Sequence, residues 1–379
     1  MKILFYMTRF PGFGGIETVT EIIGNALIDK GYEIILLAHL LQSDRESLLL
    51  KRCKCFYMPD DIDWTANDNY TFAERIILNE KIDAIIYQDS YAPTENIVCK
   101  LSIEYNIPLF VFEHNTPIYY RKQRDLLPQK SIIRQLYRKF ISWPKRERYE
   151  RNRRRYLIQN STKYILLANS YISELLDVCG YDEVPKNVFI INNPIPICTS
   201  AESVKDNIIL FVGRLEPEKG VDKLLHIFSD SRIYLKGWKF IIVGDGSERN
   251  KLEKYVYDMK LRNVIFCGFQ NPDTYYKKAK LFWMASSYEG WPLTLLEAMS
   301  KGCIPVVYDG FSSVTDIIDD GINGFIIDSS KVDSFVKQSL EVIEDESLRE
   351  SMAYKAILKS QNFEVSSIIS SWTKMLEEL

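Results

Sequence analysis

The chain has 379 residues, of which 46% are hydrophobic and 26% are charged. This length favours two domains over a single core, and this composition excludes a disordered or fibrous protein. The formal net charge of −3 hides an asymmetry, because residues 121–155 hold fourteen Lys or Arg against three Asp or Glu. We therefore expect this basic segment to meet an anionic partner.

Cysteine usage and apolar runs bear on the compartment. The seven cysteines are scattered, and the one Cys-x-Cys, from Cys53 to Cys55, lacks the second pair that a zinc site needs. No cleavage site follows Met1–Met7, and the longest apolar run, Ile34–Leu41, is far too short to cross a membrane. The sequence therefore predicts a cytoplasmic protein, with a peripheral position on the inner face of the cell membrane as a further option.

In the first half of the chain, short β-branched or aromatic runs alternate with longer amphipathic ones, a pattern typical of a parallel sheet covered by helices. The expected strands are residues 3–7, 33–38, 83–87, 109–112 and 164–168. After the first strand, Gly14 and Gly15 open a helix, where the backbone can approach a ligand, although a plain tight turn explains them equally well. The second strand ends at Ala38-His39-Leu40 without an acid for a ribose, which argues against a nicotinamide enzyme.

His114 follows an expected strand in Phe112-Glu113-His114-Asn115. At the carboxyl end of a parallel strand, a histidine can donate to a substrate hydroxyl through one ring nitrogen. The alternative is a histidine satisfied by loop carbonyls. His39 and His226 lack such a setting and are expected to be structural.

A domain boundary is expected at the prolines of Asn192-Asn193-Pro194-Ile195-Pro196, before a second alternating series begins at Asn207. The first domain is therefore predicted over residues 1–192 and the second over 193–362. Residues 363–379 form a final amphipathic helix.

Charged and glycine-rich loops follow the expected strands of the second half. Arg214 and Lys219 lie in Gly-Arg-Leu-Glu-Pro-Glu-Lys-Gly, where a planar fork and a point charge could bind the two phosphates of a diphosphate. The alternative is a pair of solvated loop charges. Two more loops, Gly244-Asp245-Gly246 and Gly268-Phe269-Gln270, follow the next strands.

The stretch from Ser286 to Val307 predicts a strand, loop, helix and strand. The amides of Gly290 to Thr294 would lie at the positive end of the helix dipole, which favours a phosphate. Glu289 and Glu297 flank this position eight residues apart. Ionised carboxylates only accept hydrogen bonds, so they favour sugar hydroxyls beside the phosphate, although a solvated Glu297 and an ordinary loop Glu289 are the alternative.

These motifs resemble the Glu-x7-Glu signature of the retaining GT-B glycosyltransferases of family 4, the glycosyl transferases group 1. The resemblance implies two Rossmann-like α/β/α domains with parallel sheets facing across a cleft, and a last helix that returns to the first domain. It implies that Glu289 and His114 contact the donor hexose, that Glu297 contacts the ribose, and that Arg214 and Lys219 neutralise the leaving diphosphate. The other implied donor-binding positions are Gly14, Gly15, Gly213, Gly244, Gly246, Phe269, Gly290, Trp291, Pro292, Leu293 and Thr294.

The resemblance implies transfer of a hexose, with retention, from a nucleoside-diphosphate sugar to a saccharide or lipid-linked acceptor in bacterial polysaccharide or glycolipid synthesis. A UDP-sugar is preferred as donor. The alternatives are a GDP-mannose-dependent mannosyltransferase, a GT-B sugar-nucleotide epimerase and a non-catalytic nucleotide-sugar-binding subunit.

Neither a metal nor a cofactor besides the nucleotide sugar is expected. Asp60-Asp61-Ile62-Asp63 reads as a loop. Within residues 121–155, the spacing over residues 131–143 predicts an amphipathic helix with a basic face. Such a helix could lie on an anionic membrane surface, whereas the alternative is a core-packed helix beside a solvated one. Nucleic acid is not expected as a partner, because no familiar motif is present.

Overall fold

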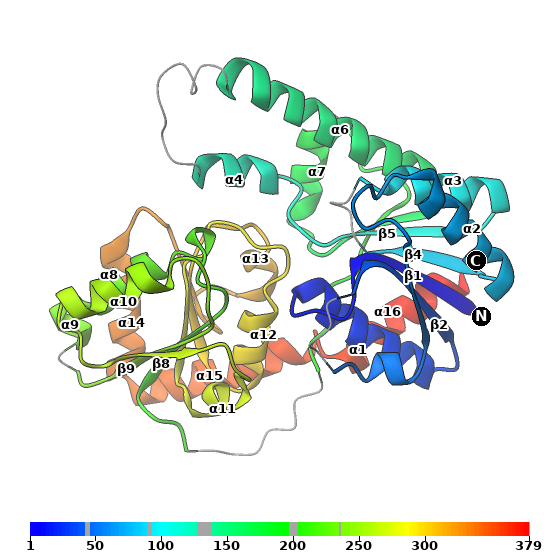
Figure 1. The fold of residues 1–379 in the computed structure, drawn as a ribbon. Helices are drawn as coiled ribbons and strands as arrows, with labels where there is room; N and C mark the ends of the chain where they lie inside the picture. The colour runs from blue at the N-terminus through cyan, green and yellow to red at the C-terminus, as the bar shows by residue number, and fades with distance from the viewer. Residues whose placement is uncertain (42–45, 89–92, 127–137, 197–203, 235, 379) are drawn as a thin grey trace. The chain divides into compact units, whose positions relative to one another are not determined.

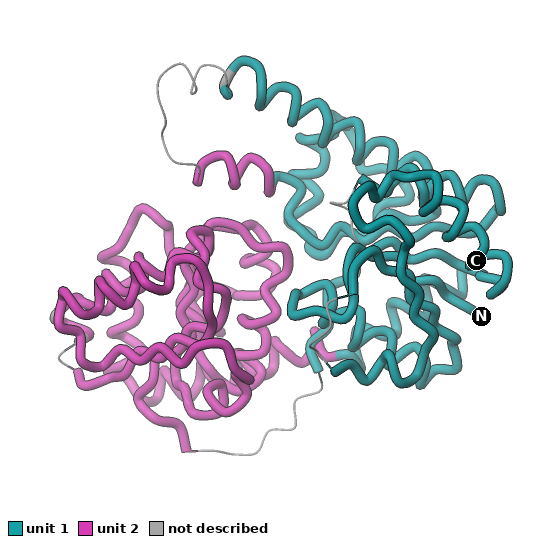
Figure 2. The backbone as a smooth tube through the Cα atoms, in the orientation of Figure 1, with its two compact units in different colours: residues 1–118, 128–196, 365–379 teal, residues 119–127, 197–364 magenta. Residues whose placement is uncertain are grey.

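The computed structural model describes residues 1–41, 46–88, 93–126, 138–196, 204–234 and 236–378. The chain forms two compact units (Figure 2). Unit 1 comprises residues 1–118, 128–196 and 365–379, and unit 2 comprises residues 119–127 and 197–364. Each unit is therefore assembled from segments that are far apart in the sequence.

Unit 1 is built on a seven-stranded sheet whose paired strands are all parallel, in the order β3-β2-β1-β4-β5-β6-β7 (Figure 1). The strands are β1 (Lys2–Arg9), β2 (Glu33–Leu40), β3 (Lys54–Tyr57), β4 (Ala84–Tyr87), β5 (Leu109–Glu113), β6 (Lys163–Leu166) and β7 (Val188–Ile190). The helical segments are α1 (Gly15–Asp29), η1 (Leu49–Lys51), α2 (Asn67–Glu80), α3 (Glu95–Tyr105), η2 (Arg138–Ser142), α6 (Trp143–Asn160), α7 (Tyr171–Cys179) and α16 (Val365–Glu377).

The last helix, α16, belongs to unit 1 and packs beside α1. Its Trp372 is fully buried and stacks on Phe112 of β5, with ring centroids 4.4 Å apart, and more distantly on Phe5 of β1. Because a large aromatic side chain buries much apolar area, this contact ties the end of the chain to its first sheet.

Unit 2 is built on a six-stranded parallel sheet in the order β10-β9-β8-β11-β12-β13 (Figure 1). The strands are β8 (Ile208–Val212), β9 (Lys239–Val243), β10 (Val264–Gly268), β11 (Leu281–Met284), β12 (Ile304–Tyr308) and β13 (Phe325–Ile327). The helical segments are α4 (Tyr119–Leu126), η3 (Pro217–Lys219), α8 (Val221–Phe228), α9 (Ser231–Tyr234), α10 (Arg249–Asp258), α11 (Asp273–Lys278), α12 (Leu293–Ser300), α13 (Val314–Ile317), α14 (Val332–Glu344) and α15 (Glu346–Gln361).

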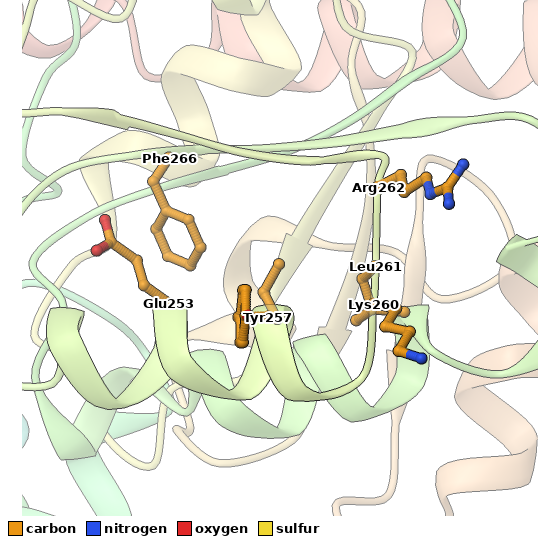
Figure 3. Close-up of a pocket in the computed structure, with 7 residues that line it drawn as sticks. Glu253, Tyr257, Lys260, Leu261, Arg262 and Phe266 are labelled. Atoms are coloured by element: carbon orange, nitrogen blue, oxygen red, sulfur yellow. The ribbon is translucent and has the colours of Figure 1, made fainter.

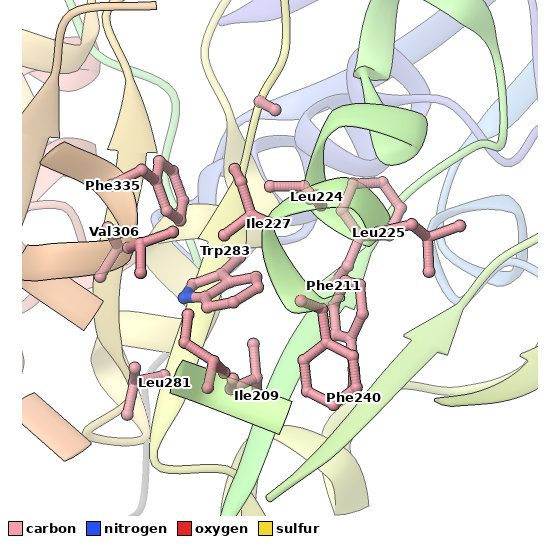
Figure 4. Close-up of a cluster of buried hydrophobic side chains, with 14 of the residues drawn as sticks. Ile209, Phe211, Leu224, Leu225, Ile227, Phe240, Leu281, Trp283, Val306 and Phe335 are labelled. Atoms are coloured by element: carbon pink, nitrogen blue, oxygen red, sulfur yellow. The ribbon is translucent and has the colours of Figure 1, made fainter. Parts of the chain in front are cut away.

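Trp283 of β11 lies at the centre of the core of unit 2 (Figure 4). Its ring packs edge-on against Phe335 of α14 at 5.3 Å, and it lies tilted against Phe240 of β9 at 5.5 Å. Apolar residues fill nearly every position of the central strands because helices cover both faces of a parallel sheet. The two parallel α/β units predicted from the sequence are confirmed.

The arginines of α6 correct one expectation for the basic segment. Arg154 is fully buried and ion-paired with Glu113 and Glu150, and the buried Arg153 is ion-paired with Glu95. These side chains complete the interior of unit 1 and do not face a partner. Removing one would leave a buried carboxylate uncompensated.

Two neighbouring arginines of α6 are also used within unit 1. Arg151 Nε donates to the carbonyl of Val178, and Arg155 Nε donates to the carbonyl of Cys179. Both bonds satisfy carbonyls at the end of α7, where a helix leaves its last acceptors unpaired. The predicted amphipathic helix over residues 131–143 falls largely outside the described residues. Among the described helices, none is both long and apolar enough to cross a membrane.

Candidate active site

Three loops of unit 2 leave the carboxyl edge of its sheet side by side, because β8 pairs with both β9 and β11. They are residues 213–220, 244–248 and 286–292. Backbone bonds join them: Leu215 N donates to Asp245 O at 2.8 Å, and Ser287 N donates to Glu218 O at 2.7 Å. The loops that the sequence marked in separate motifs therefore form one connected surface.

Close packing between these loops requires glycine. Gly244 has a φ of +141°, and a Cβ there would overlap the carbonyl oxygen of Gly213. A Cβ on Gly246 would lie 2.5 Å from the carbonyl oxygen of Leu215. These predicted nucleotide-binding glycines are thus needed for the backbone approach of one loop to the next, whether or not a ligand is bound.

Lys219 and Glu289, the cation and the carboxylate predicted for the donor, pair with each other. Lys219 Nζ lies 2.7 Å from Glu289 Oε1, and the two side chains are only 17% and 13% exposed. Arg214 differs, because its side chain is 73% exposed and its Nη2 lies 3.4 Å from Glu218 Oε1. The site therefore holds one sheltered ion pair and one exposed guanidinium that can reorient.

Helix α12 begins at Leu293, with Pro292 as its N-cap. The amides of Leu295 and Leu296 reach back to the carbonyl of Pro292. The amides of Leu293 and Thr294 precede them, in the turn where a helix offers no internal acceptor. The positive end of the α12 dipole is thus presented in the loop that carries Glu289.

Two predicted donor-binding residues have different surroundings. The indole of Trp291 is buried and packs on Phe363, with ring centroids 5.3 Å apart. Its ring serves the core of unit 2, so only its backbone is left for a ligand. Phe269, at the end of β10, is an exposed ring.

Glu297 lies on the second turn of α12 and is half-buried. The hydroxyl of Tyr276, on α11, donates to its Oε2 at 2.9 Å. Burial raises the pKa of Glu297, and the bond from Tyr276 opposes that rise because it favours the ionised form. Tyr276 was not predicted from the sequence, since nothing in a short helix twenty-one residues upstream signals this contact.

A second contact that was not predicted from the sequence involves α4, the part of the basic segment that belongs to unit 2. Gln123 Nε2 donates to the hydroxyl of Tyr288, beside Glu289, at 3.4 Å. Lys122 Nζ donates to the carbonyl of Gly310 at 3.2 Å. Helix α4 therefore lies against loops that follow β11 and β12.

The remaining predicted residues lie in unit 1. Gly14 is the N-cap of α1, and a Cβ there would overlap the carboxylate of Glu17, whereas a Cβ on Gly15 would meet nothing within 4 Å. Gly14 therefore permits a close approach of the helix's own acid. Gly15 has no such packing reason to be glycine.

His114 is buried at the end of β5, and both of its ring nitrogens have partners. Nε2 bonds to the Oε1 of Gln88, and Nδ1 lies 3.4 Å from the Nδ2 of Asn193. Since an amide oxygen only accepts and an amide nitrogen only donates, these partners assign the proton to Nε2. Burial lowers the pKa of His114 to about 3, so the ring is neutral. A bond to a hexose would require it to give up one partner.

Similarity to known proteins agrees with this geometry. The family model for glycosyl transferases group 1 matches residues 199–359, and the model for Glycosyltransferase Family 4 matches residues 13–197. The solved structure of Anabaena HepE with UDP and glucose superposes with a TM-score of 0.75 at 18% identity over 100% of both chains. That of the lipopolysaccharide outer core galactosyltransferase WaaB has a TM-score of 0.72 at 19% identity, again over 100% of both chains. The chain belongs to the GT-B glycosyltransferases.

Two of the sequence relatives of this GT-B chain are bacterial enzymes. It is 28% identical to the amylovoran biosynthesis glycosyltransferase AmsD of Erwinia amylovora over 201 residues. The aligned residues cover 50% of this chain and 56% of AmsD. It is also 26% identical, over 321 residues, to a Campylobacter jejuni α-1,4-N-acetyl-D-galactosaminyltransferase whose name gives an undecaprenol-diphosphate-linked glycan as its substrate. This alignment covers 81% of this chain and 78% of that enzyme. The match to AmsD therefore spans little more than half of that relative.

Unit 2 of this GT-B glycosyltransferase also contains a hollow. It is formed between α10 and β10 (Figure 3). Its lining residues are Glu253, Val256, Tyr257, Lys260, Leu261, Arg262 and Phe266. None of these lining residues is among those predicted to bind the donor, although β10 leads on to the predicted Phe269.

Proposed function

We propose that this protein transfers a hexose from a nucleoside-diphosphate sugar to an acceptor hydroxyl, with retention at the anomeric carbon. The observation that carries the proposal is the sheltered pair of Lys219 and Glu289 next to the start of α12. A cation, a carboxylate and a helix N-terminus together suit a ligand that joins a diphosphate to sugar hydroxyls.

In the proposed mechanism, the diphosphate draws Lys219 away from Glu289. The carboxylate of Glu289 is then available to the hexose hydroxyls. Arg214, exposed at 73%, turns toward the same diphosphate. The cations and the helix dipole stabilise the negative charge that grows on the leaving group as the glycosidic bond breaks.

Retention is proposed to arise from attack on the face that the leaving group departs from, so no protein nucleophile is assigned. The acceptor oxygen bonds to the anomeric carbon, and its proton passes to the departing diphosphate. Because cationic side chains are assigned to the diphosphate, we propose that no metal ion and no further cofactor are required. The assignment of His114 to the donor hexose stays a prediction from the sequence.

The donor is proposed to be a UDP-sugar carrying galactose, glucose or an N-acetylhexosamine. HepE binds UDP-glucose and UDP in its solved structures, which supports uracil as the base. The acceptor is proposed to be a saccharide or a lipid-linked saccharide in cell-surface polysaccharide or glycolipid synthesis. The names of the Campylobacter enzyme and of a Salmonella lipopolysaccharide 1,6-galactosyltransferase support this class.

A cytoplasmic location, peripheral on the inner face of the membrane, is proposed with a revised contact surface. Phe140 and Ile141, between Arg138 and Lys145, are 65% and 44% exposed. Exposed apolar side chains beside cations suit a surface of anionic lipid. We propose this tip of η2 and α6 because the fold uses Arg151, Arg153, Arg154 and Arg155 of the basic segment within unit 1.

The test is transfer from radiolabelled UDP-galactose, UDP-glucose, UDP-N-acetylhexosamines and GDP-mannose, each with and without a lipid extract. Labelled product that needs the extract supports the proposal, and the donor used decides between a UDP-sugar and GDP-mannose. Conversion of the donor without acceptor would identify an epimerase. Binding without any conversion would identify a non-catalytic subunit. Glu289→Ala serves as the inactive control in all arms.

A further inference from the structure

Tyr276 is a buried phenol whose hydroxyl points at the carboxylate of Glu297. It is 3% exposed, and its ring lies 6.3 Å from that of Phe282 on β11. The hydroxyl donates to Glu297 Oε2 at 2.9 Å. A phenol has a single proton to donate, so this bond uses it fully.

The backbone of Tyr276 is held in place by two donors from other segments. Lys205 Nζ donates to its carbonyl oxygen at 3.2 Å, and the thiol of Cys303, just before β12, donates to the same oxygen at 3.1 Å. Lys205 also donates to the carbonyl of Ala279 at 2.5 Å. A helix as short as α11 is weak by itself, so these contacts fix the direction of the phenol.

The hydrogen bond from Tyr276 limits both the orientation and the protonation of the Glu297 carboxylate. A carboxylate held through Oε2 keeps the lone pairs of Oε1 for a further donor. Burial and the nearby Asp273, also on α11, both raise the pKa of Glu297, and the Tyr276 hydroxyl is the group that lowers it. Tyr276 therefore favours the ionised, acceptor-only form of a half-buried acid.

We propose that Tyr276 is a positioning residue that aims Glu297 at the vicinal hydroxyls of a ribose, which makes the site specific for ribonucleotides. This inference rests on the proposed function, because it takes a nucleoside diphosphate as the ligand. Tyr276 itself acts only through Glu297 and does not touch the ligand.

The test is calorimetric binding of UDP and of 2′,3′-dideoxy-UDP to the full chain and to Tyr276→Phe. The parent protein should bind UDP at least tenfold more tightly than the dideoxy compound. Tyr276→Phe should weaken UDP binding about tenfold, the scale of a lost hydrogen bond to a charged group, and leave dideoxy-UDP binding unchanged. An equal loss for both ligands, or no loss for either, would overturn the positioning role.

Two further variants serve as a control and as a second test of the positioning role. Tyr308→Phe removes the hydroxyl of another fully buried tyrosine in unit 2 and should leave the preference for UDP unchanged. Lys205→Met removes one donor from the Tyr276 carbonyl, so it should lower the preference for UDP over dideoxy-UDP. This variant keeps the proposal testable if Tyr276→Phe does not fold. An unchanged preference in Lys205→Met would then contradict the proposal.

Failure of the proposed function and failure of the positioning role of Tyr276 would give different binding results. A parent protein that binds neither UDP nor GDP would refute the proposed function. A parent protein that binds UDP and dideoxy-UDP equally would leave the proposed function standing and refute the ribose role of Glu297, and with it that of Tyr276. In Glu297→Gln, adding Tyr276→Phe should cause no further loss, because the tyrosine acts through the acid.

Discussion

Lys219 Nζ and Glu289 Oε1 lie 2.7 Å apart, so the two residues assigned to different parts of the donor are partners of each other. They are seventy positions apart in the chain, and they meet because β8 and β11 are neighbours in the sheet. A diphosphate and a carboxylate would then compete for the same ammonium. This competition makes the two glutamates of the Glu-x7-Glu motif experimentally separable.

Glu289→Ala should leave UDP binding equal to or tighter than that of the parent, because Lys219 no longer has a competing carboxylate. Turnover of the nucleotide sugar should be lost. Glu297→Ala should instead weaken UDP binding. Isothermal calorimetry with UDP and a turnover assay with the sugar donor separate the two effects, and an equal loss of UDP binding in both variants would show that the assigned roles are wrong.

Arg214→Ala and Lys219→Ala should each reduce kcat by about two to three orders of magnitude, the scale of losing one transition-state donor. The matched control is Lys223→Ala, an exposed cation on α8, which should keep near-normal turnover. Thermal unfolding of each variant checks that the fold is intact. Near-normal turnover in both Arg214→Ala and Lys219→Ala would place the diphosphate elsewhere.

Transfer should survive chelation. With excess EDTA, the rate should stay within about twofold of the untreated rate, because side-chain cations and the α12 dipole are assigned the charge on the leaving group. The measurement is the initial rate before and after dialysis against EDTA. A strict loss that added Mn²⁺ or Mg²⁺ restores would contradict this assignment.

Unit 1 should lose stability in mild acid because two histidines are buried in the neutral form. Burial lowers the pKa of His39 to about 4 and that of His114 to about 3, both below the ordinary 6.5. Below about pH 6.5, these two histidines therefore bind protons in the unfolded chain but stay neutral in the folded chain. This contribution is complete above pH 6.5 and is lost as the pH falls toward 3 to 4, by roughly 1.4 kcal/mol per pH unit for each histidine.

The measurement is the free energy of unfolding in denaturant between pH 7.5 and 5. His39→Gln and His114→Gln should each flatten the slope, whereas His226→Gln, at an exposed position of α8, should not. Identical slopes in the parent and both buried-site variants would mean that neither ring stays neutral.

Binding to anionic vesicles should depend on the tip formed by η2 and the start of α6. Phe140→Ser with Ile141→Ser should abolish co-sedimentation with phosphatidylglycerol vesicles, and Lys145→Gln with Arg148→Gln should weaken it by about 1 kcal/mol per charge. Tyr257→Ser, which removes an exposed ring of α10, is the control and should bind normally. Equal binding to neutral vesicles, or none to either, would return the tip to another role.

The local sequence predicted the strands, the loops that follow them and the family motif. Apolar runs followed by glycine-rich loops predicted parallel strands, and parallel strands end at one edge of a sheet. Together with the family resemblance, these patterns led to the prediction that Arg214, Lys219, Glu289 and Glu297 share one site. The family motif was equally local, since Glu289 and Glu297 lie in one loop and the helix that follows it.

Tertiary structure alone decided which of these groups touch. The order β9-β8-β11 brings Lys219 to Glu289, and the packing of α11 brings Tyr276 to Glu297. Similarly, the charge run at the end of α6 looked like a surface, yet Arg154 is buried because Glu113 of β5 meets it there, beside Glu150 of its own helix. A charged side chain becomes interior only when its partners are buried with it, and no local pattern records which distant segment supplies them.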